Sequence, residues 1–206
     1  MYFFEETGGG GTRPWSLNFV EAASAQPMFL ALPPGSTSFL HTMGTASSAT
    51  VGWGEVLWAT GSGAVIFAYS VFTQRVPGRG AQEETAEAIP LIDGRYLVPF
   101  DDTGGAVTAI AIANASNSVV SQSVSVGVRT ADGGVTQLPP ITVPTLGHMS
   151  FAFPAQFPST ANQRGLAEFA TDSLGIAIIA LQFDAGAFTT VPVYAVSGPP
   201  IIITPN

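Results

Sequence analysis

The chain has 206 residues, of which only 10% are charged, and six Arg, no Lys and 14 acidic residues give it a formal charge of -8. It cannot form the basic face that binds a phosphate backbone, so nucleic acid is excluded as a partner. The lack of cysteine excludes a disulfide framework, a thiolate metal site and a cysteine nucleophile.

Short bursts of Val, Ile, Thr and Phe alternate along the chain with turn-forming residues, and the sequence contains 23 Gly and 16 Pro. This pattern is typical of strands joined by turns, whereas signals for long helices are weak. The sequence therefore predicts an all-β protein.

The first predicted strand, Tyr2–Phe4, runs into an acidic, glycine-rich turn, and the same pattern recurs at Val98–Phe100. We expect two modules that begin alike. The carboxylates of these turns are weak candidates for calcium ligands: Glu5, Glu6, Asp101 and Asp102. A calcium loop needs a denser alternation of carboxylates, so solvated turns are the favoured interpretation and no metal or other cofactor is assigned.

Three further strands are expected in the first half, at 16–20, 28–32 and 35–39, and each has a counterpart in the second half. The offset between matching segments rises from 96 at the first strand to about 109 here, so about 13 residues lack a counterpart. The unmatched segment is the predicted strand Ala106–Asn114. The first module should therefore lack a strand near Gly11–Trp15 and have an open edge that needs a cover.

The clearest repeat is a 19-residue segment, found at Gly54–Phe72 and again at Gly165–Phe183 without a gap. A segment repeated at a fixed offset indicates a duplicated module. Each copy is predicted to be a hairpin of two core strands, with Phe72 and Phe183 at matching core positions. Both faces of the second strand are apolar in each copy, so we expect both faces to be covered.

A polar loop is predicted at Thr73–Glu84, and the Asp93-Gly94 turn marks the boundary between modules. The expected organisation is module 1 at 1–92, one strand short, module 2 at 93–197 and an apolar tail strand at 198–206. In module 2, 131–134 is predicted to be a hairpin loop and Pro154–Thr160 a short helical turn.

The tail carries a β-branched run with no module of its own to enter: Ile201, Ile202, Ile203 and Thr204. Adding this strand to the open edge of another copy would satisfy backbone hydrogen bonds and bury the isoleucines. Because donor and acceptor differ, such a contact propagates as a filament unless it closes into a ring. A tail that folds back on its own module, or that stays loose, is the alternative.

The run from Gly147 to Ala195, with VPFDDTGG and AIAIANAS before it, resembles a tandem Ig-like β-sandwich repeat of large predicted secreted proteins of acidobacteria. The first half, with LPPGSTSFL and VGWGEV, resembles a preceding repeat of the same kind. The resemblance implies an extracellular or cell-surface module of unassigned function. It implies no catalytic residue, and the strand missing from the first half is its departure from the pattern.

Other candidate site residues favour structural roles. His41 and His148 lie at non-equivalent repeat positions without an acidic residue at triad or ligand spacing, so packing is favoured over catalysis. Strand parity places Trp58 in the core and Trp53 outward, where it is a candidate surface or carbohydrate contact. Asn114 begins an Asn-Ala-Ser glycosylation sequon, which is a weak signal.

Three functions follow from these patterns. The first is a non-enzymatic extracellular structural subunit that self-assembles, as a filament or surface appendage. The second is a carbohydrate- or surface-binding accessory module. The third, a transmembrane β-barrel, requires longer alternating strands than these proline-punctuated ones. The apolar runs are also shorter than the ~20 residues of a spanning helix, and no signal peptide is visible at the start.

Overall fold

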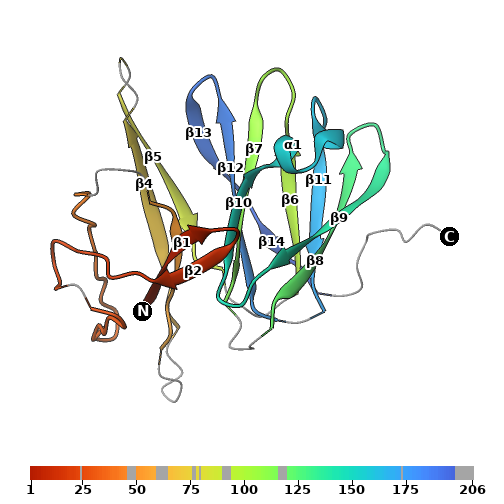
Figure 1. Cartoon of the computed structure of the whole chain (residues 1–206). Coiled ribbons are helices and arrows are strands. Elements are labelled where there is room, and N and C mark those ends of the chain that lie inside the picture. The colour runs from red at the N-terminus through yellow and green to blue at the C-terminus, as the bar shows by residue number, and fades with distance from the viewer. Residues whose placement is uncertain are drawn as a thin grey trace. The chain divides into compact units, whose positions relative to one another are not determined.

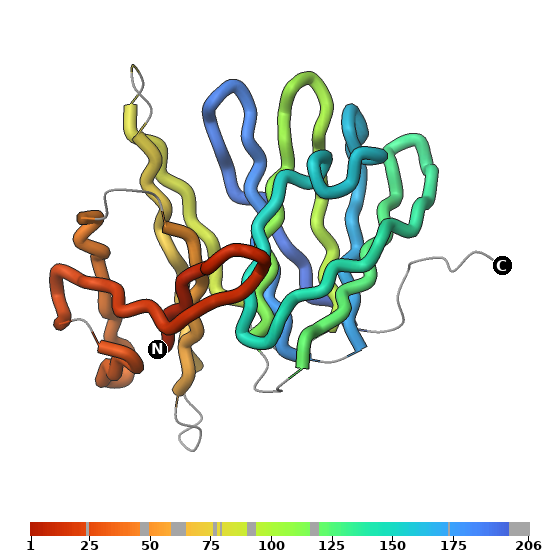
Figure 2. Tube along the Cα trace, in the orientation of Figure 1, coloured from red at the N-terminus to blue at the C-terminus, as the bar shows by residue number. Residues whose placement is uncertain are grey.

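The structure is a computed structural model. It describes residues 1–23, 25–45, 50–58, 65–75, 78, 80–89, 94–115, 120–172 and 174–197. The chain divides into two compact units, Met1–Ile66 and Phe67–Asn206. The regular structure is nearly all-β, as the sequence predicts, and both units contain antiparallel sheets (Figures 1 and 2).

The N-terminal unit contains a three-stranded antiparallel sheet in the order β2-β1-β3. Its strands are β1 (Tyr2–Gly8), β2 (Gly11–Pro14) and β3 (Gly52–Glu55). The β1–β2 turn uses glycines with positive φ, at 89° for Gly8, 62° for Gly9 and 80° for Gly10, a backbone region that other residues rarely adopt. The strand expected to be missing near Gly11–Trp15 is therefore present in shortened form.

The predicted strands at 16–20, 28–32 and 35–39 do not form. Within the described residues of these segments, the one pairing is an isolated bridge between Phe19 and Thr42. Among the described residues of these segments, no backbone pairing extends this bridge into a strand. Phe19 and Met28 are nevertheless buried.

The C-terminal unit contains a β-sandwich of two antiparallel sheets (Figure 1). One sheet has the order β14-β6-β11-β8-β9. Its strands are β6 (Arg95–Asp101), β8 (Gln122–Thr130), β9 (Val135–Val143), β11 (Arg164–Ala170) and β14 (Tyr194–Ala195). The other sheet has the order β10-β7-β12-β13. Its strands are β7 (Val107–Asn114), β10 (His148–Ala152), β12 (Ile176–Asp184) and β13 (Ala187–Val191).

The sandwich confirms most strands predicted for the second half, as well as the hairpin loop between β8 and β9. The predicted core hairpin is wrong, because β11 and β12 belong to opposite sheets. β11 lies between β6 and β8, and β12 lies between β7 and β13. The turn between them therefore crosses from one sheet to the other.

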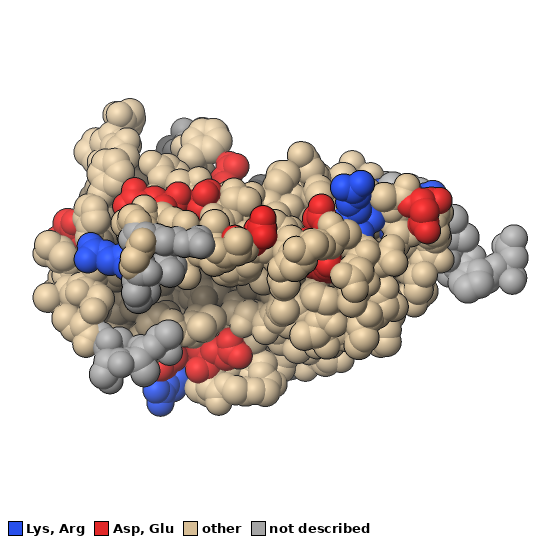
Figure 3. Space-filling model, turned by 90° about the horizontal axis from the view of Figure 1, so that it is seen from above, with Lys and Arg blue, Asp and Glu red and all other residues tan. Residues whose placement is uncertain are grey.

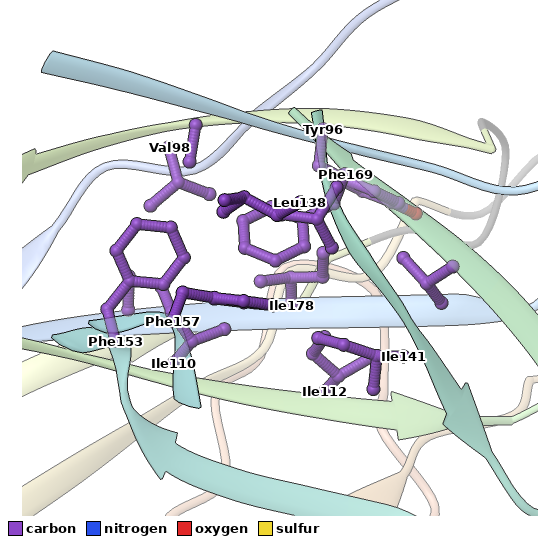
Figure 4. Packing of buried hydrophobic residues seen from close by; sticks show 14 of the residues in the cluster. Tyr96, Val98, Ile110, Ile112, Leu138, Ile141, Phe153, Phe157, Phe169 and Ile178 are labelled. Atoms are coloured by element: carbon purple, nitrogen blue, oxygen red, sulfur yellow. The ribbon is translucent and has the colours of Figure 1, made fainter. Parts of the chain in front are cut away.

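The core lies between the two sheets and is filled by alternate residues of the inner strands (Figure 4). In β6, Tyr96, Val98 and Phe100 point inward. The predicted helical turn forms as α1 (Phe153–Gln156) and η1 (Pro158–Thr160). It supplies Phe153 and Phe157, whose rings pack edge to face with centroids 5.4 Å apart.

Residues 73–84, predicted as a polar loop, instead belong mainly to a two-stranded hairpin of β4 (Tyr69–Arg75) and β5 (Ala81–Glu87). Seven residue pairs align in register, from Tyr69–Glu87 to Arg75–Ala81. The repeat predicts that Phe72 and Phe183 are core residues. This prediction is wrong, because the exposed fractions of the two side chains are 37% and 36%. In the first copy the strand β4 is largely exposed, whereas in the second copy Ile176, Ile178 and Ala180 are in the core and the exposure is confined to the end of β12.

The division between compact units falls at Ile66 and Phe67, whereas the sequence places the module boundary between Ile92 and Asp93. Positions 92 and 93 lie outside the described residues. The duplication stays a prediction. The β1–β2 hairpin has no equivalent in the C-terminal unit, where β6 and the next strand, β7, lie in opposite sheets.

Candidate functional site

The N-terminal unit buries few apolar side chains. Among its described residues, the buried hydrophobic side chains are those of Phe4, Phe19 and Met28. Phe3 packs against Phe19 with ring centroids 5.5 Å apart, and Phe4 stacks on Trp53 at 4.5 Å. These contacts hold the small sheet together but form only a thin core.

The same unit exposes many large apolar side chains. Phe29 is 86% exposed and Phe39 is 61% exposed. The others are Val20, Leu30, Leu32, Met43, Val51, Leu57, Trp58 and Val65. A scattered exposed hydrophobe is ordinary, but exposure on this scale beside so small a core is typical of an interaction surface.

Charge does little to offset this apolar surface. The molecule seen from above shows scattered acidic and basic side chains separated by wide uncharged areas (Figure 3). With 10% charged residues, the chain has few groups to keep apolar surfaces of separate molecules apart.

The five-stranded sheet of the sandwich is protected at its edges against pairing with other chains. Edge strand β9 carries Pro139 and Pro140, and its register with β8 shifts between Val124 and Val126. Proline removes a backbone donor and a bulge disrupts the ladder, so both features hinder the addition of another strand.

At the opposite edge of this sheet, the short strand β14 pairs with β6 at Tyr96 and Leu97, and the N–H of Val196 donates to the carbonyl of Arg95. Beyond that point Pro99 has no backbone N–H, and side chains satisfy the backbone groups of Asp101. Its N–H donates to Thr108 Oγ1 at 3.0 Å, and its carbonyl accepts from Gln182 Nε2 at 2.7 Å. This edge is therefore closed by side chains.

The carboxylates of the two acidic turns considered for calcium lie in different units. Glu5 pairs with Arg13, with Nε and Oε2 2.7 Å apart, and Glu6 lies next to it on β1. Asp101 accepts hydrogen bonds through Oδ1 from the N–H and hydroxyl of Thr103, which lower its pKa. Among the described residues, no group of three potential metal-ligating side chains occurs.

Asp102 is the unusual carboxylate of the second turn, because it is only 5% exposed. Its Oδ1 accepts the Thr108 N–H at 2.7 Å, whereas Oδ2 is buried without a hydrogen-bond partner in the described part of the chain. Burial raises its pKa, and the hydrogen bond from Thr108 opposes that shift.

A buried ion pair lies on the outer face of the five-stranded sheet, where sequence reasoning predicted none. Arg95 Nε lies 2.5 Å from Glu168 Oε1, and the two side chains are 11% and 7% exposed. A shallow concavity beside them is lined by residues that include Leu97, Leu166 and Gly127. Local sequence carries no signal for this pair, because its members come from β6 and β11.

The aromatic candidates differ from expectation. Trp53 is half-buried against Phe4 rather than outward, and Trp58 is 46% exposed rather than in the core. Trp53 is thus not a flat, open platform for a sugar. Counting alternate residues of a strand misplaced Trp58 because β3 ends at Glu55, three residues before it.

The histidines take different positions. His41 is exposed, and its backbone N–H donates to Glu21 Oε2 at 2.7 Å while Nδ1 contacts Oε1. His148 is buried on β10, which agrees with a packing role. Asn114, the sequon residue, is fully buried and donates through Nδ2 to the carbonyls of Val143 and Pro144, so the folded chain does not present it for glycosylation.

The tail residues Ile201, Ile202, Ile203 and Thr204, considered for self-assembly, lie outside the described residues. No helix in the described part of the chain is both long and apolar enough to cross a membrane. No family model, no curated protein and no solved structure matches the chain.

Proposed function

We propose that this protein is a non-enzymatic structural subunit that associates with copies of itself. The observation that carries the proposal is the imbalance in the N-terminal unit, where Phe4, Phe19 and Met28 are buried while a larger set of apolar side chains faces solvent. Burying apolar surface stabilises association by ~25 cal/mol per Å² before the entropic cost of binding. An extracellular or cell-surface location, implied by the resemblance, belongs to the same proposal.

Association through apolar side chains also fits the composition. The chain combines a mean hydropathy of +0.36 with 10% charged residues. Interfaces of permanent homo-oligomers are more apolar than the rest of the protein surface.

The test is the assembly state of the protein and of the variant Phe29→Ser/Phe39→Ser, measured by sedimentation velocity and negative-stain microscopy. Because both side chains are exposed, these changes should alter the free energy of unfolding by no more than about 0.5 kcal/mol each. We expect the unchanged protein to assemble and the double variant to form smaller species.

The matched control is Thr12→Ser/Ser38→Ala, which leaves the apolar surface intact and should assemble normally. A wild-type chain that stays monomeric across the concentration range contradicts the proposal. So does a double variant that assembles as well as the wild type.

A further inference from the structure

Strand β4 has an unprotected edge. The N–H of Ala88 donates to the carbonyl of Ala68 at 2.8 Å, which fixes the residues of β4 that bond to β5. Because alternate residues of an antiparallel strand face one neighbour, the backbones of Ser70, Phe72 and Gln74 point toward β5. The backbone N–H and C=O groups of the other four residues point away from β5: Tyr69, Val71, Thr73 and Arg75.

No hydrogen bond is made by these outward backbone groups within the described residues. The strand has no proline and no lysine, and its ladder with β5 has no bulge. Its apolar side chains are exposed, at 60% for Tyr69 and 54% for Val71. A long, regular, apolar edge of this kind readily pairs with another strand, unlike the proline-protected β9.

We propose that β4 pairs antiparallel with β4 of a second copy, around a two-fold axis at Phe72. The two hairpins then form one continuous four-stranded sheet. In this register Phe72 faces Phe72 of the second copy, Val71 faces Thr73, and Tyr69 faces Arg75. All seven residues of β4 are paired, and the outward N–H and C=O groups exchange hydrogen bonds.

Charge complementarity selects this register. Arg75 makes no ion pair within the described residues, and it faces Ala81 in its own hairpin. In the dimer, its guanidinium lies over the ring of Tyr69, where a cation is favoured. Glu87 lies directly beyond Tyr69 on β5, so the same cation also approaches a carboxylate. A shift by two residues in either direction removes Arg75 from Tyr69.

This inference deepens the proposed function by naming one contact, and it does not depend on the exposed phenylalanines of the N-terminal unit. Because the chain has no cysteine, single-cysteine variants report the register cleanly. A residue on the axis lies ~4.5 Å from its copy, measured between Cα atoms, which is within reach of a disulfide. Ser70 lies on the same face but is offset from its copy by four residues, or roughly 14 Å.

The experiment compares disulfide formation in Phe72→Cys and Ser70→Cys under a mild oxidant, followed on non-reducing gels. We expect Phe72→Cys to form a reducible dimer at least about tenfold faster than Ser70→Cys, because only the axial pair meets the distance requirement. Equal rates, or no dimer from Phe72→Cys, overturn the inference.

A second measurement uses Val71→Pro, which removes an N–H that points away from β5 and so leaves the hairpin ladder intact. Val71→Thr is the matched control. We expect sedimentation to show loss of the β4 contact in Val71→Pro but not in Val71→Thr, with circular dichroism confirming that both are folded. If Val71→Pro does not fold, the cysteine pair alone decides. A protein that assembles while Phe72→Cys fails to cross-link loses this inference and keeps the proposed function, whereas a strictly monomeric chain contradicts both.

Discussion

Three buried polar side chains each perform a definable task in the sandwich. The hydroxyl of Tyr96 donates to the carbonyl of Ile176 at 2.7 Å and so joins one sheet to the other. Asn114 joins β7 to the end of β9 in the same way. Asp102 anchors the start of β7 through the Thr108 N–H, at the expense of leaving Oδ2 without a partner in the described structure. Buried polar groups with partners stabilise one arrangement, whereas a buried carboxylate is disfavoured in its charged form.

The raised pKa of Asp102 predicts a specific pH dependence. A carboxyl whose pKa is higher in the folded state favours folding when protonated, and this stabilisation is lost as pH rises from about 4 through the folded-state pKa. Asp102→Asn keeps an acceptor for Thr108 and cannot ionise. Its free energy of unfolding, relative to the wild type, should therefore increase with pH in urea titrations across this range.

Asp132 provides a control of opposite sign. It is exposed, and hydrogen bonds from the Thr130 hydroxyl and the Gly134 N–H lower its pKa. Stabilisation from such a group is present above its unfolded-state pKa and is lost as pH falls. Asp132→Asn should therefore lose stability relative to the wild type as pH rises from about 3 to 5. Parallel pH profiles for the two variants contradict the assignment.

Tyr96→Phe should cost about 1 to 3 kcal/mol in the free energy of unfolding, because it leaves the buried carbonyl of Ile176 without this donor. Tyr194→Phe removes a hydroxyl from a side chain that is 54% exposed and should change stability by no more than about 0.5 kcal/mol. Thermal or urea unfolding of both variants measures the difference in the free energy of unfolding. Equal effects argue against a stabilising hydrogen bond from Tyr96 to Ile176.

The strands of the two units depend on different features of the sequence. Strands of the sandwich alternate between core and outer side chains, whereas β3 depends on glycine. A Cβ on Gly52 would lie 2.1 Å from the carbonyl oxygen of Phe4 and 3.0 Å from the ring of Trp15. Small residues here allow β3 to approach β1.

Gly52→Ala should therefore displace β3 from β1 and loosen the stacking of Trp53 on Phe4. Overpacking of this kind typically costs about 1 to 3 kcal/mol. Gly80→Ala is the control, because a Cβ at Gly80 meets nothing within 4 Å. Tryptophan fluorescence during unfolding should change for Gly52→Ala and remain that of the wild type for Gly80→Ala.

Sequence patterns identified most strands of the sandwich because short runs rich in β-branched and aromatic residues, of usual strand length, are bounded there by turn-forming residues. They did not reveal that β11 and β12 lie in different sheets, since a hairpin and a crossover share the same local alternation. They also missed β5, where Glu83, Glu84 and Glu87 gave a strand the composition of a loop. The Arg95–Glu168 pair and the free edge of β4 depend on which strands become neighbours, and no local pattern records that.

At the scale of the whole molecule, two routes to assembly can be separated. The tail route, proposed from Ile201–Thr204, is heterologous and open-ended, whereas the β4 contact is two-fold and closed. A chain with both contacts can extend beyond a dimer, and a chain with the β4 contact alone cannot do so through these two routes.

Deleting Pro199–Asn206 tests the tail route. Strand donation by the tail requires large assemblies to disappear while the dimer detected by cross-linking of Phe72→Cys persists, because the deletion leaves β4 intact. Negative-stain microscopy and sedimentation velocity measure the two outcomes in one sample series. An unchanged assembly size after the deletion contradicts strand donation by the tail.

The distribution of strands between the two sheets also governs how the sandwich forms during synthesis. β6 pairs with β11 and β7 pairs with β12, so each early strand must wait for a partner that follows much later in the chain. Closing such long loops before any pairing is gained slows folding to milliseconds or seconds. Until β12 has left the ribosome, the alternating isoleucines of β7 have no partner on that side. The nascent chain then exposes apolar strand surface and an unpaired strand edge, which make it prone to aggregation.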